Sequence, residues 1–158
     1  MADLAPAETR VAILPEWTDA NGHLNVAYYV LAFDRATDAF YERLGLGWSI
    51  LVDQRSMFTL AMNVDYLSEV FAGETVTIES RVLDCDAKRL HYFHAMRRER
   101  DGAIVATNEI VALHVAMTTR RSTPFPADVA TLLGAMKAAH AALPRPPRAG
   151  RTLGLARA

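Results

Sequence analysis

The stretch Thr18 to Tyr29, TDANGHLNVAYY, gathers the side chains of this chain that are best suited to chemistry. Asp19 is followed at short spacing by Asn21, His23 and Asn25, and the apolar pattern of a helix begins directly after them. A carboxylate or an imidazole in such a place can act as a nucleophile, a general acid or a general base. The same residue types suit a turn and a helix cap, so both interpretations stand.

The start of the expected helix is a chemical feature in its own right. The first turn of a helix leaves backbone N–H groups unpaired and carries the positive end of the helix dipole. Such donors stabilise the oxyanion that forms during acyl transfer, each by on the order of 3 kcal/mol. Because Gly22 permits close approach of a ligand or a positive φ, we expect an oxyanion site at the N–H groups of Gly22, His23 and Leu24.

His23 and Asn25 each allow more than one role. His23 suits a general acid or base, a donor that positions substrate, or a ring packed on a sheet. Asn25 is a good N-cap whether or not it contacts a substrate. One His and one Asp four residues apart fall short of a zinc ligand set, so no metal is expected.

The elements around this stretch indicate one α+β domain. Residues 8–17 are typical of a first strand, and apolar residues at helical spacing predict a helix over 25–44. An amphipathic pattern predicts a short helix over 128–143. Between the helices, the sequence predicts four strands, over residues 55–67, 74–84, 88–100 and 103–118.

These elements predict how the chain packs. Short turns between the four strands predict an antiparallel meander, and a helix that is apolar nearly all round at its start has to be wrapped by a sheet. We therefore expect a hotdog fold, with a long central helix wrapped by a five-stranded antiparallel sheet and a short C-terminal helix. Residues 1–143 form this domain, and the Pro/Arg-rich tail 144–158 is flexible or draped on the surface.

The composition excludes several functional classes. A chain of 158 residues with 51% hydrophobic and 22% charged residues is typical of one globular domain. A net charge of -1 argues against binding to nucleic acid or a membrane surface. No apolar run approaches the ~20 residues of a membrane span, and no secretory signal precedes the domain, so a cytoplasmic location is expected.

A family resemblance adds to this interpretation. DANGHLNVAYY resembles the D-x-N-G-H-x-N-x-x-Y signature of hotdog-fold thioesterases related to 4-hydroxybenzoyl-CoA thioesterase. The likeness covers most of residues 10–155 and includes AILPEWTDANGHLNVAYYVLAFDRATDAF, DAKRLHYFHAMRRERDG and STPFP. These segments are similar to stand-alone betainyl-CoA thioesterases and to the thioesterase module found with carnitine dehydrogenase.

The resemblance implies hydrolysis of an acyl-CoA to a free acid and CoA, in carnitine or betaine metabolism. CoA is part of the substrate, and no metal or organic cofactor is implied. The family's acid falls on Asp19, as base or nucleophile, and its other motif residues fall on Gly22, His23 and Asn25. A homodimer or dimer of dimers is implied, with sites where the helix start of one subunit meets strands of another.

Binding residues are expected around the motif and at strand ends. A betainyl group is a quaternary ammonium, which two or three aromatic rings can enclose, although core packing is the alternative. The aromatic residues near the motif are Trp17, Tyr28, Tyr29, Phe33, Trp48 and Tyr66. We expect substrate contacts from Trp17, Asn21, Tyr28 and Tyr66. Lys88, Arg89 and Arg120 are expected to bind CoA phosphates, unless they are merely solvated charge.

Two other functions remain open. A hotdog acyl-CoA hydratase or dehydratase also uses an Asp and a His, but its signature resembles D-x-N-P-x-H. Here His23 is four residues after Asp19 and Gly22 stands where that signature has proline, which disfavours this alternative. A non-catalytic acyl-CoA-binding module is the second alternative, and the presence of the acid disfavours it.

Overall fold

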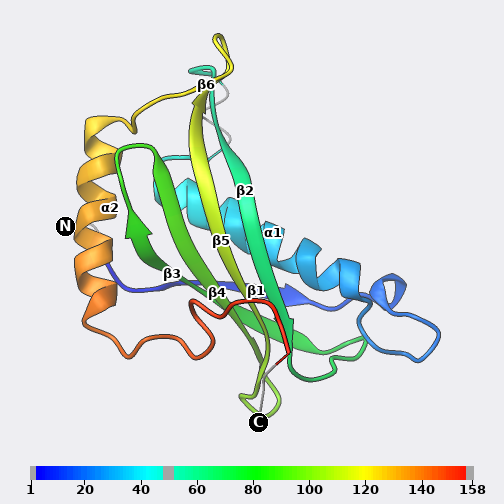
Figure 1. Ribbon diagram of the computed structural model, residues 1–158. Coiled ribbons are helices and arrows are strands. Elements are labelled where there is room, and N and C mark those ends of the chain that lie inside the picture. Colours follow the sequence, from blue (N-terminus) through cyan, green and yellow to red (C-terminus); the bar gives the residue numbers. More distant parts are fainter. Residues whose placement is uncertain (1–2, 48–51, 156–158) are drawn as a thin grey trace.

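The structure is a computed structural model that describes residues 3–47 and 52–155 (Figure 1). It contains two α-helices, one 3-10 turn and six strands within these residues. In chain order the elements are β1 (Ala7–Ala12), η1 (Pro15–Trp17), α1 (Val26–Arg43), β2 (Arg55–Tyr66), β3 (Thr75–Cys85), β4 (Arg89–Arg98), β5 (Ile104–Ala116), β6 (Arg121–Ser122) and α2 (Ala127–Ala141).

One antiparallel sheet has the strand order β1-β3-β4-β5-β2, and β6 pairs with β5. The predicted four-strand meander is wrong, because only β3, β4 and β5 follow one another. The segment between β2 and β3 runs back against the loop before α1, where the Leu24 N–H donates to the Val70 carbonyl (2.7 Å). The chain therefore re-enters the sheet beside β1 and β4, and β2 is left at the opposite edge.

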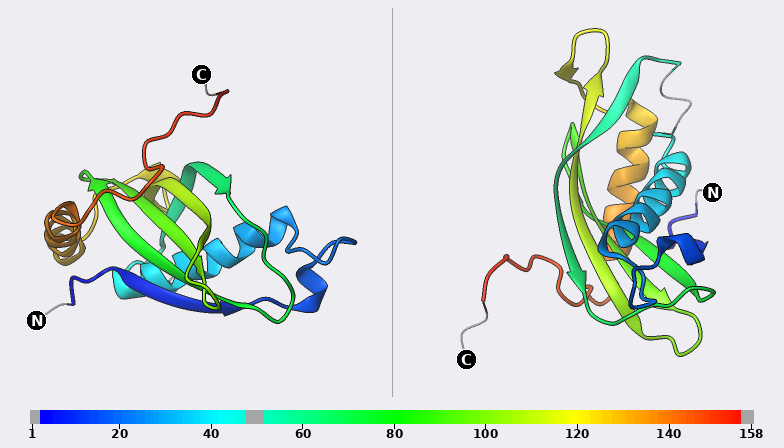
Figure 2. Two further views of the ribbon diagram at one scale, coloured as in Figure 1. Left: turned by 90° about the horizontal axis from the view of Figure 1, so that it is seen from below. Right: turned by 90° about the vertical axis from the view of Figure 1, so that its right-hand side faces the viewer.

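The hotdog fold is confirmed, with one strand more than expected. The extra strand is β6, which forms because the chain turns back after β5 and Ser122 pairs with Val115. Figure 2 shows α1 and α2 on one face of the curved sheet. The helices α1 and α2 begin one residue after and one residue before their predicted starts, respectively, and each ends within two residues of its prediction.

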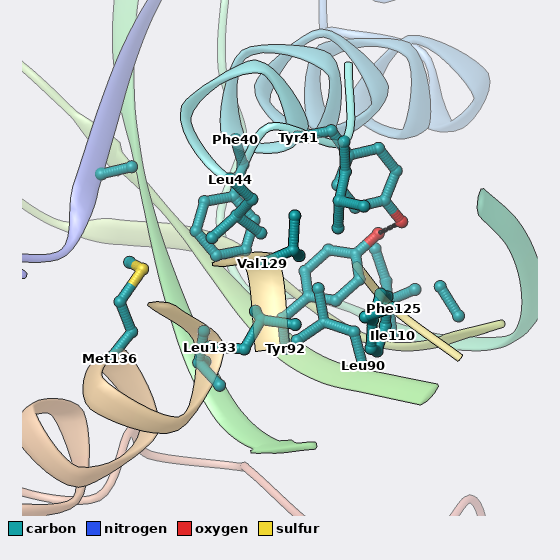
Figure 3. Close-up of a cluster of buried hydrophobic side chains, with 14 residues drawn as sticks. Phe40, Tyr41, Leu44, Leu90, Tyr92, Ile110, Phe125, Val129, Leu133 and Met136 are labelled. Atoms are coloured by element: carbon teal, nitrogen blue, oxygen red, sulfur yellow. Dashed lines mark hydrogen bonds between the residues drawn. The ribbon is translucent and has the colours of Figure 1, made fainter. Parts of the chain in front are cut away.

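The core lies between α1 and the sheet. Side chains alternate between the two faces of β3, and the inward residues Val76, Ile78, Ser80 and Val82 are all buried. A second part of the core, shown in Figure 3, joins the end of α1 to α2. There the Tyr41 and Tyr92 hydroxyls are hydrogen-bonded to each other at 3.0 Å. Burying each large apolar side chain contributes about 2 kcal/mol.

His94 on β4 is a fully buried polar residue within this core. Its Nε2 is 2.9 Å from Thr37 Oγ1 on α1, and its Nδ1 is 2.8 Å from Ser80 Oγ on β3. The Phe33 ring stacks on it at 5.9 Å. Burial lowers the pKa of His94 to about 3, so the ring is neutral and both of its nitrogens have partners. His91, three residues earlier, faces the other side of the sheet, because residues an odd number apart on a strand point to opposite faces.

The tail lies on the outer face of the sheet, away from α1 (Figure 2). The carboxylate of Asp65 on β2 accepts hydrogen bonds from Arg148 Nε (2.7 Å) and Arg151 Nε (3.0 Å). The hydrogen bond from Arg148, with that from Arg151, lowers the pKa of Asp65 to about 2. The Gly150 N–H donates to Glu109 Oε2 at 2.7 Å. Residues 148–151 are thus bound to the sheet surface.

We predict that His94 makes stability fall in mild acid. The unfolded chain binds a proton at His94 below a pKa of about 6.5, whereas the folded protein does so only near 3. Stability from this residue is therefore complete above pH 6.5 and falls by about 1.4 kcal/mol per pH unit on acidification. Urea unfolding at pH 7, 5.5 and 4.5 measures this slope. For His94→Gln, whose side chain does not titrate, the free energy of unfolding should change less with pH. Equal slopes for this variant and the parent would contradict the assignment.

Candidate functional site

Asp19 sits at the rim of a short, closed loop between η1 and α1. The Asp19 N–H donates to the His23 carbonyl (2.9 Å), and the Gly22 N–H donates to the Asp19 carbonyl (2.9 Å). Gly22 has a φ of 77°, in the left-handed region that favours glycine. The Asn21 N–H donates to Asp19 Oδ1 at 2.8 Å, so the carboxylate does serve the turn. Its other oxygen remains available, because the side chain is exposed.

The three amides expected to form the oxyanion site are not equivalent. The Gly22 and Leu24 N–H groups are occupied by the carbonyls of Asp19 and Val70. The N–H groups of Gly22 and Leu24 are therefore unsuited to bind an oxyanion in this conformation. The His23 N–H has no acceptor among the described residues. This pattern follows from the antiparallel bridges that close the loop, because along an extended segment only every second N–H points toward the paired segment.

The His23 ring is oriented by the segment that follows β2. Its Nδ1 is 3.3 Å from Glu69 Oε1, and its edge meets the Phe71 ring with centroids 5.0 Å apart. About a third of the side chain is exposed (32%), which leaves the ring accessible on one side. A partly exposed imidazole beside a carboxylate can donate a hydrogen bond to a ligand in the loop.

Asn25 is the N-cap of α1, as the sequence indicated. Its Oδ1 accepts a hydrogen bond from the Ala27 N–H at 3.0 Å, and its φ and ψ of -69° and 148° are those of extended backbone. The Asn25 N–H donates to the Trp17 carbonyl (2.9 Å), which ties the cap to η1. This bond fixes the start of α1 relative to the Asp19 loop.

We predict that Asn25→Ala lowers the free energy of unfolding by about 1 kcal/mol, because Ala cannot accept the hydrogen bond from the Ala27 N–H. Asn25→Ser retains a capping oxygen and should recover most of this loss. Thermal or urea unfolding of the two variants beside the parent measures the difference. An Ala variant as stable as the parent would mean that the cap contributes nothing.

The candidate aromatic residues are divided between the core and the surface. Trp17 is buried and stacks on Tyr28 at 5.7 Å, and the Arg35 guanidinium lies 4.6 Å from its ring centroid. The face of Trp17 is thus already occupied by a cation of the protein. Tyr66 is 47% exposed and meets Tyr29 edge-on at 5.3 Å. Phe33 is core, and Trp48 lies outside the described residues.

The basic residues expected to bind CoA lie far from Asp19 in one protomer. The Asp19 loop neighbours the end of β2, where Tyr66 pairs with Ala106, while the Lys88 carbonyl accepts from the His114 N–H. The eight residue steps from 106 to 114 span about 26 Å of strand. Lys88 Nζ is 3.4 Å from Ser122 Oγ, close to Arg120 in the turn between β5 and β6.

Arg89 is already paired within the protein. Its guanidinium lies 2.6 Å from the Asp86 carboxylate, and both residues line a hollow of about 340 Å³ on the outer face. The hydrogen bonds from the Lys88 N–H and from Arg89 hold the pKa of Asp86 at about 2. Arg89 is therefore a weaker candidate for a phosphate than Lys88 or Arg120, whose side chains make no ion pair with a described residue.

Asn108 on β5 is a candidate residue that sequence reasoning missed. It is 1% exposed, and its Oδ1 has no hydrogen-bond partner among the described residues. A buried amide without a partner costs free energy, so its presence needs an explanation. The signal in the sequence was the Asn in the otherwise apolar inward pattern of Ala106, Ile110 and Ala112.

Neither helix of the described chain has the length and hydrophobicity needed to cross a membrane. Within residues 3–47 and 52–155, no three His, Cys, Asp or Glu side chains are placed to hold a metal ion together. That hydrolysis needs no metal stays a prediction.

Comparisons with known proteins connect this geometry with a family. The model of the thioesterase-like superfamily matches residues 13–133. The chain is 40% identical over 144 residues to betainyl-CoA thioesterase of Pseudomonas aeruginosa, covering 90% of this chain and 91% of that protein. It is 30% identical over 138 residues to L-carnitine dehydrogenase/betainyl-CoA thioesterase of Rhizobium meliloti, covering 87% of this chain and 28% of that protein.

A solved structure agrees with these relatives. A Staphylococcus aureus protein determined in complex with CoA superimposes with a TM-score of 0.88 at 27% identity, covering 96% of each chain. The likeness therefore includes the whole sheet and both helices.

Proposed function

The chain belongs to the thioesterase-like superfamily and is a thioester hydrolase, and we propose that its substrate is betainyl-CoA or a closely related short-chain acyl-CoA. The observation that carries this proposal is the Asp19 loop at the start of α1 in a chain 40% identical to a betainyl-CoA thioesterase. The products are the free acid and CoA.

Asp19 supplies the carboxylate for the reaction. As a base, it takes a proton from water, whose oxygen adds to the thioester carbonyl, and CoA thiolate then leaves and takes up that proton. As a nucleophile, it adds to the carbonyl itself, and water hydrolyses the resulting mixed anhydride. Both routes need a carboxylate that is open to the solvent side of the loop, and Asp19 is exposed there.

The oxyanion is stabilised by the start of α1. Of the proposed amides, the His23 N–H has no acceptor among the described residues, and the dipole of an 18-residue helix adds positive potential nearby. The His23 ring, placed by Glu69, donates toward the carbonyl or the leaving sulfur. Asn25 acts on the reaction by holding the helix start in place, and Asn21 lies beside the carboxylate.

A homodimer completes the site. β2 is an edge strand with no strand beyond it among the described residues, and it exposes Phe58 (40%), Leu60 (55%) and Met62 (47%). Such an edge favours pairing with a second copy. A two-fold axis makes the partner's β2 antiparallel, so the end of its sheet that carries Lys88 and Arg120 comes beside this Asp19 loop. Those cations can then meet the phosphates of a CoA whose thioester reaches Asp19.

The two alternatives are less well supported. A hydratase or dehydratase would add or remove water on the acyl chain without releasing thiol, and a binding module would do neither. The catalytic assay below separates all three, because free thiol is produced by hydrolysis alone.

We predict that Asp19→Asn lowers thiol release at least 100-fold, because it removes the base or nucleophile. The assay follows free thiol from betainyl-CoA and a panel of short acyl-CoAs. Asp128→Asn, an equal charge change on the exposed first turn of α2, is the matched control and should be fully active. Full activity of Asp19→Asn and Asp19→Ala would remove Asp19 from the mechanism, and no turnover of any ester by the parent would refute the function.

We predict that Leu60→Lys converts the dimer into a monomer and abolishes most turnover, because it places an unpaired charge at the centre of the β2 edge. Sedimentation velocity should show at least a tenfold weaker dimer. Leu153→Lys, which changes a side chain 88% exposed on the tail, is the control and should stay dimeric. An active monomer of the Leu60 variant would contradict the shared site.

A further inference from the structure

A small groove between α1 and β2 is set apart from the Asp19 loop. It is lined by Val30, Asp34 and Thr37 of α1, Thr59 and Met62 of β2, and Asn108 of β5. Its cavity volume is about 30 Å³, which holds little more than one water molecule. A larger group can enter it only in part, with its remaining surface covered from outside the protomer. The groove opens beside the exposed edge of β2, where Met62 is 47% exposed.

The floor of the groove carries a polar group that the fold itself does not use. Asn108 is 1% exposed, and its side-chain oxygen Oδ1 has no hydrogen-bond partner among the described residues. The contrast with His94, its pairing neighbour on β4, is direct, because both nitrogens of that buried ring are bonded. His94 thus has all of its hydrogen bonds within the protein, whereas Asn108 Oδ1 has none. This contrast indicates that Asn108 serves a ligand.

The wall formed by α1 is negatively charged. Asp34 lines the groove, and Asp38 follows one turn later on the same helix. Neither carboxylate has an ion-pair partner among the described residues. Partial burial, then the charges of Asp34 and Glu42, raise the pKa of Asp38, which shows that this side of α1 disfavours additional negative charge. A cation in the groove would relieve that repulsion.

We propose that this groove binds the quaternary ammonium end of the acyl group, with Asn108 and Asp34 as the residues that determine specificity for a cation. The inference rests on the proposed function and deepens it. A quaternary ammonium has no N–H, so it is held by negative charge and by oxygen atoms against its polarised methyl groups. Asp34 supplies the charge, and the amide oxygen of Asn108 supplies a dipole at the floor.

The length of the acyl group determines which of the two Asp19 residues in a dimer can reach the thioester carbonyl. In a betainyl ester one methylene separates the nitrogen from the thioester carbonyl. Asp34 lies eight residues into α1 from Val26, about 12 Å along the helix axis, and Asp19 lies before that helix begins. The carbonyl of a group held beside Asp34 therefore lies well along α1 from the loop that carries Asp19 of the same protomer. In the proposed homodimer the attacking carboxylate is then Asp19 of the second copy, because the Asp19 loop projects beyond the β2 edge of its own protomer (Figure 1).

The test compares two esters of equal shape. Betainyl-CoA carries the cation, and 3,3-dimethylbutanoyl-CoA has a carbon atom in place of the nitrogen. We expect Asn108→Leu and Asp34→Asn each to lower the ratio of kcat/KM for the first ester over the second about tenfold. Asp128→Asn is the control and should keep the parent ratio. Asn108→Leu should also keep its Tm or raise it by about 2–4 °C, because it removes an unpaired buried amide.

The outcomes separate this inference from the proposed function. If the parent releases thiol from no acyl-CoA, the proposed function fails. If the parent hydrolyses betainyl-CoA and both variants keep its ratio within twofold, the groove does not bind the cation and this inference alone fails. Asp34→Asn changes an exposed side chain, so it carries the test even where Asn108→Leu does not fold.

Mixed dimers test the assignment of Asp19 to the second copy. A heterodimer of Asp19→Asn with Asn108→Leu, isolated with two affinity tags, has one intact site and one doubly altered site if the site is shared. We expect it to have about half of the parent kcat/KM with betainyl-CoA. If each site lies within one protomer, every site carries one defect. Activity no higher than the average of the two single variants would therefore overturn the shared arrangement.

Discussion

The burial of α1 against the curved sheet is the interaction on which the rest of the structure depends. Phe33, Phe40 and the small residues Ala32 and Ala36 of α1 are fully buried, so the helix has one orientation across the sheet. That orientation carries the start of α1 toward the β2 edge and beyond it (Figure 1). The Asp19 loop is placed by this packing and by the hydrogen bonds that close it, and its carboxylate remains exposed.

Polar groups buried under α1 serve two different purposes. Thr37, His94 and Ser80 form a chain in which each side chain has its partner, and such a network fixes the helix over the sheet. Asn108, one strand away, has no such partner and faces a groove at the side of the helix. An unpaired buried amide lowers stability, and retaining one is typical of a position that serves a ligand.

The two faces and the two edges of the sheet are used differently. The inner face packs on the helices, and the outer face holds the tail through Asp65 and Glu109. The β1 edge lies beside β3, while the β2 edge is long, exposes Phe58, Leu60 and Met62, and has no further strand beside it among the described residues. The homodimer that we propose uses the β2 edge, whereas the outer face of the sheet is partly covered by residues 148–151.

The sequence by itself determined the motif, the cap at Asn25, the two helices and the inward pattern of β3, because capping and periodicity are local properties of the chain. It also led to the family, through the spacing of Asp19, Gly22, His23 and Asn25. Only the tertiary structure decided that β2 pairs with β5, since strand order depends on contacts distant in sequence. For the same reason, it alone placed Lys88 and Arg120 away from Asp19, occupied two of the three proposed amides, and brought Asn108 to the groove beside Asp34.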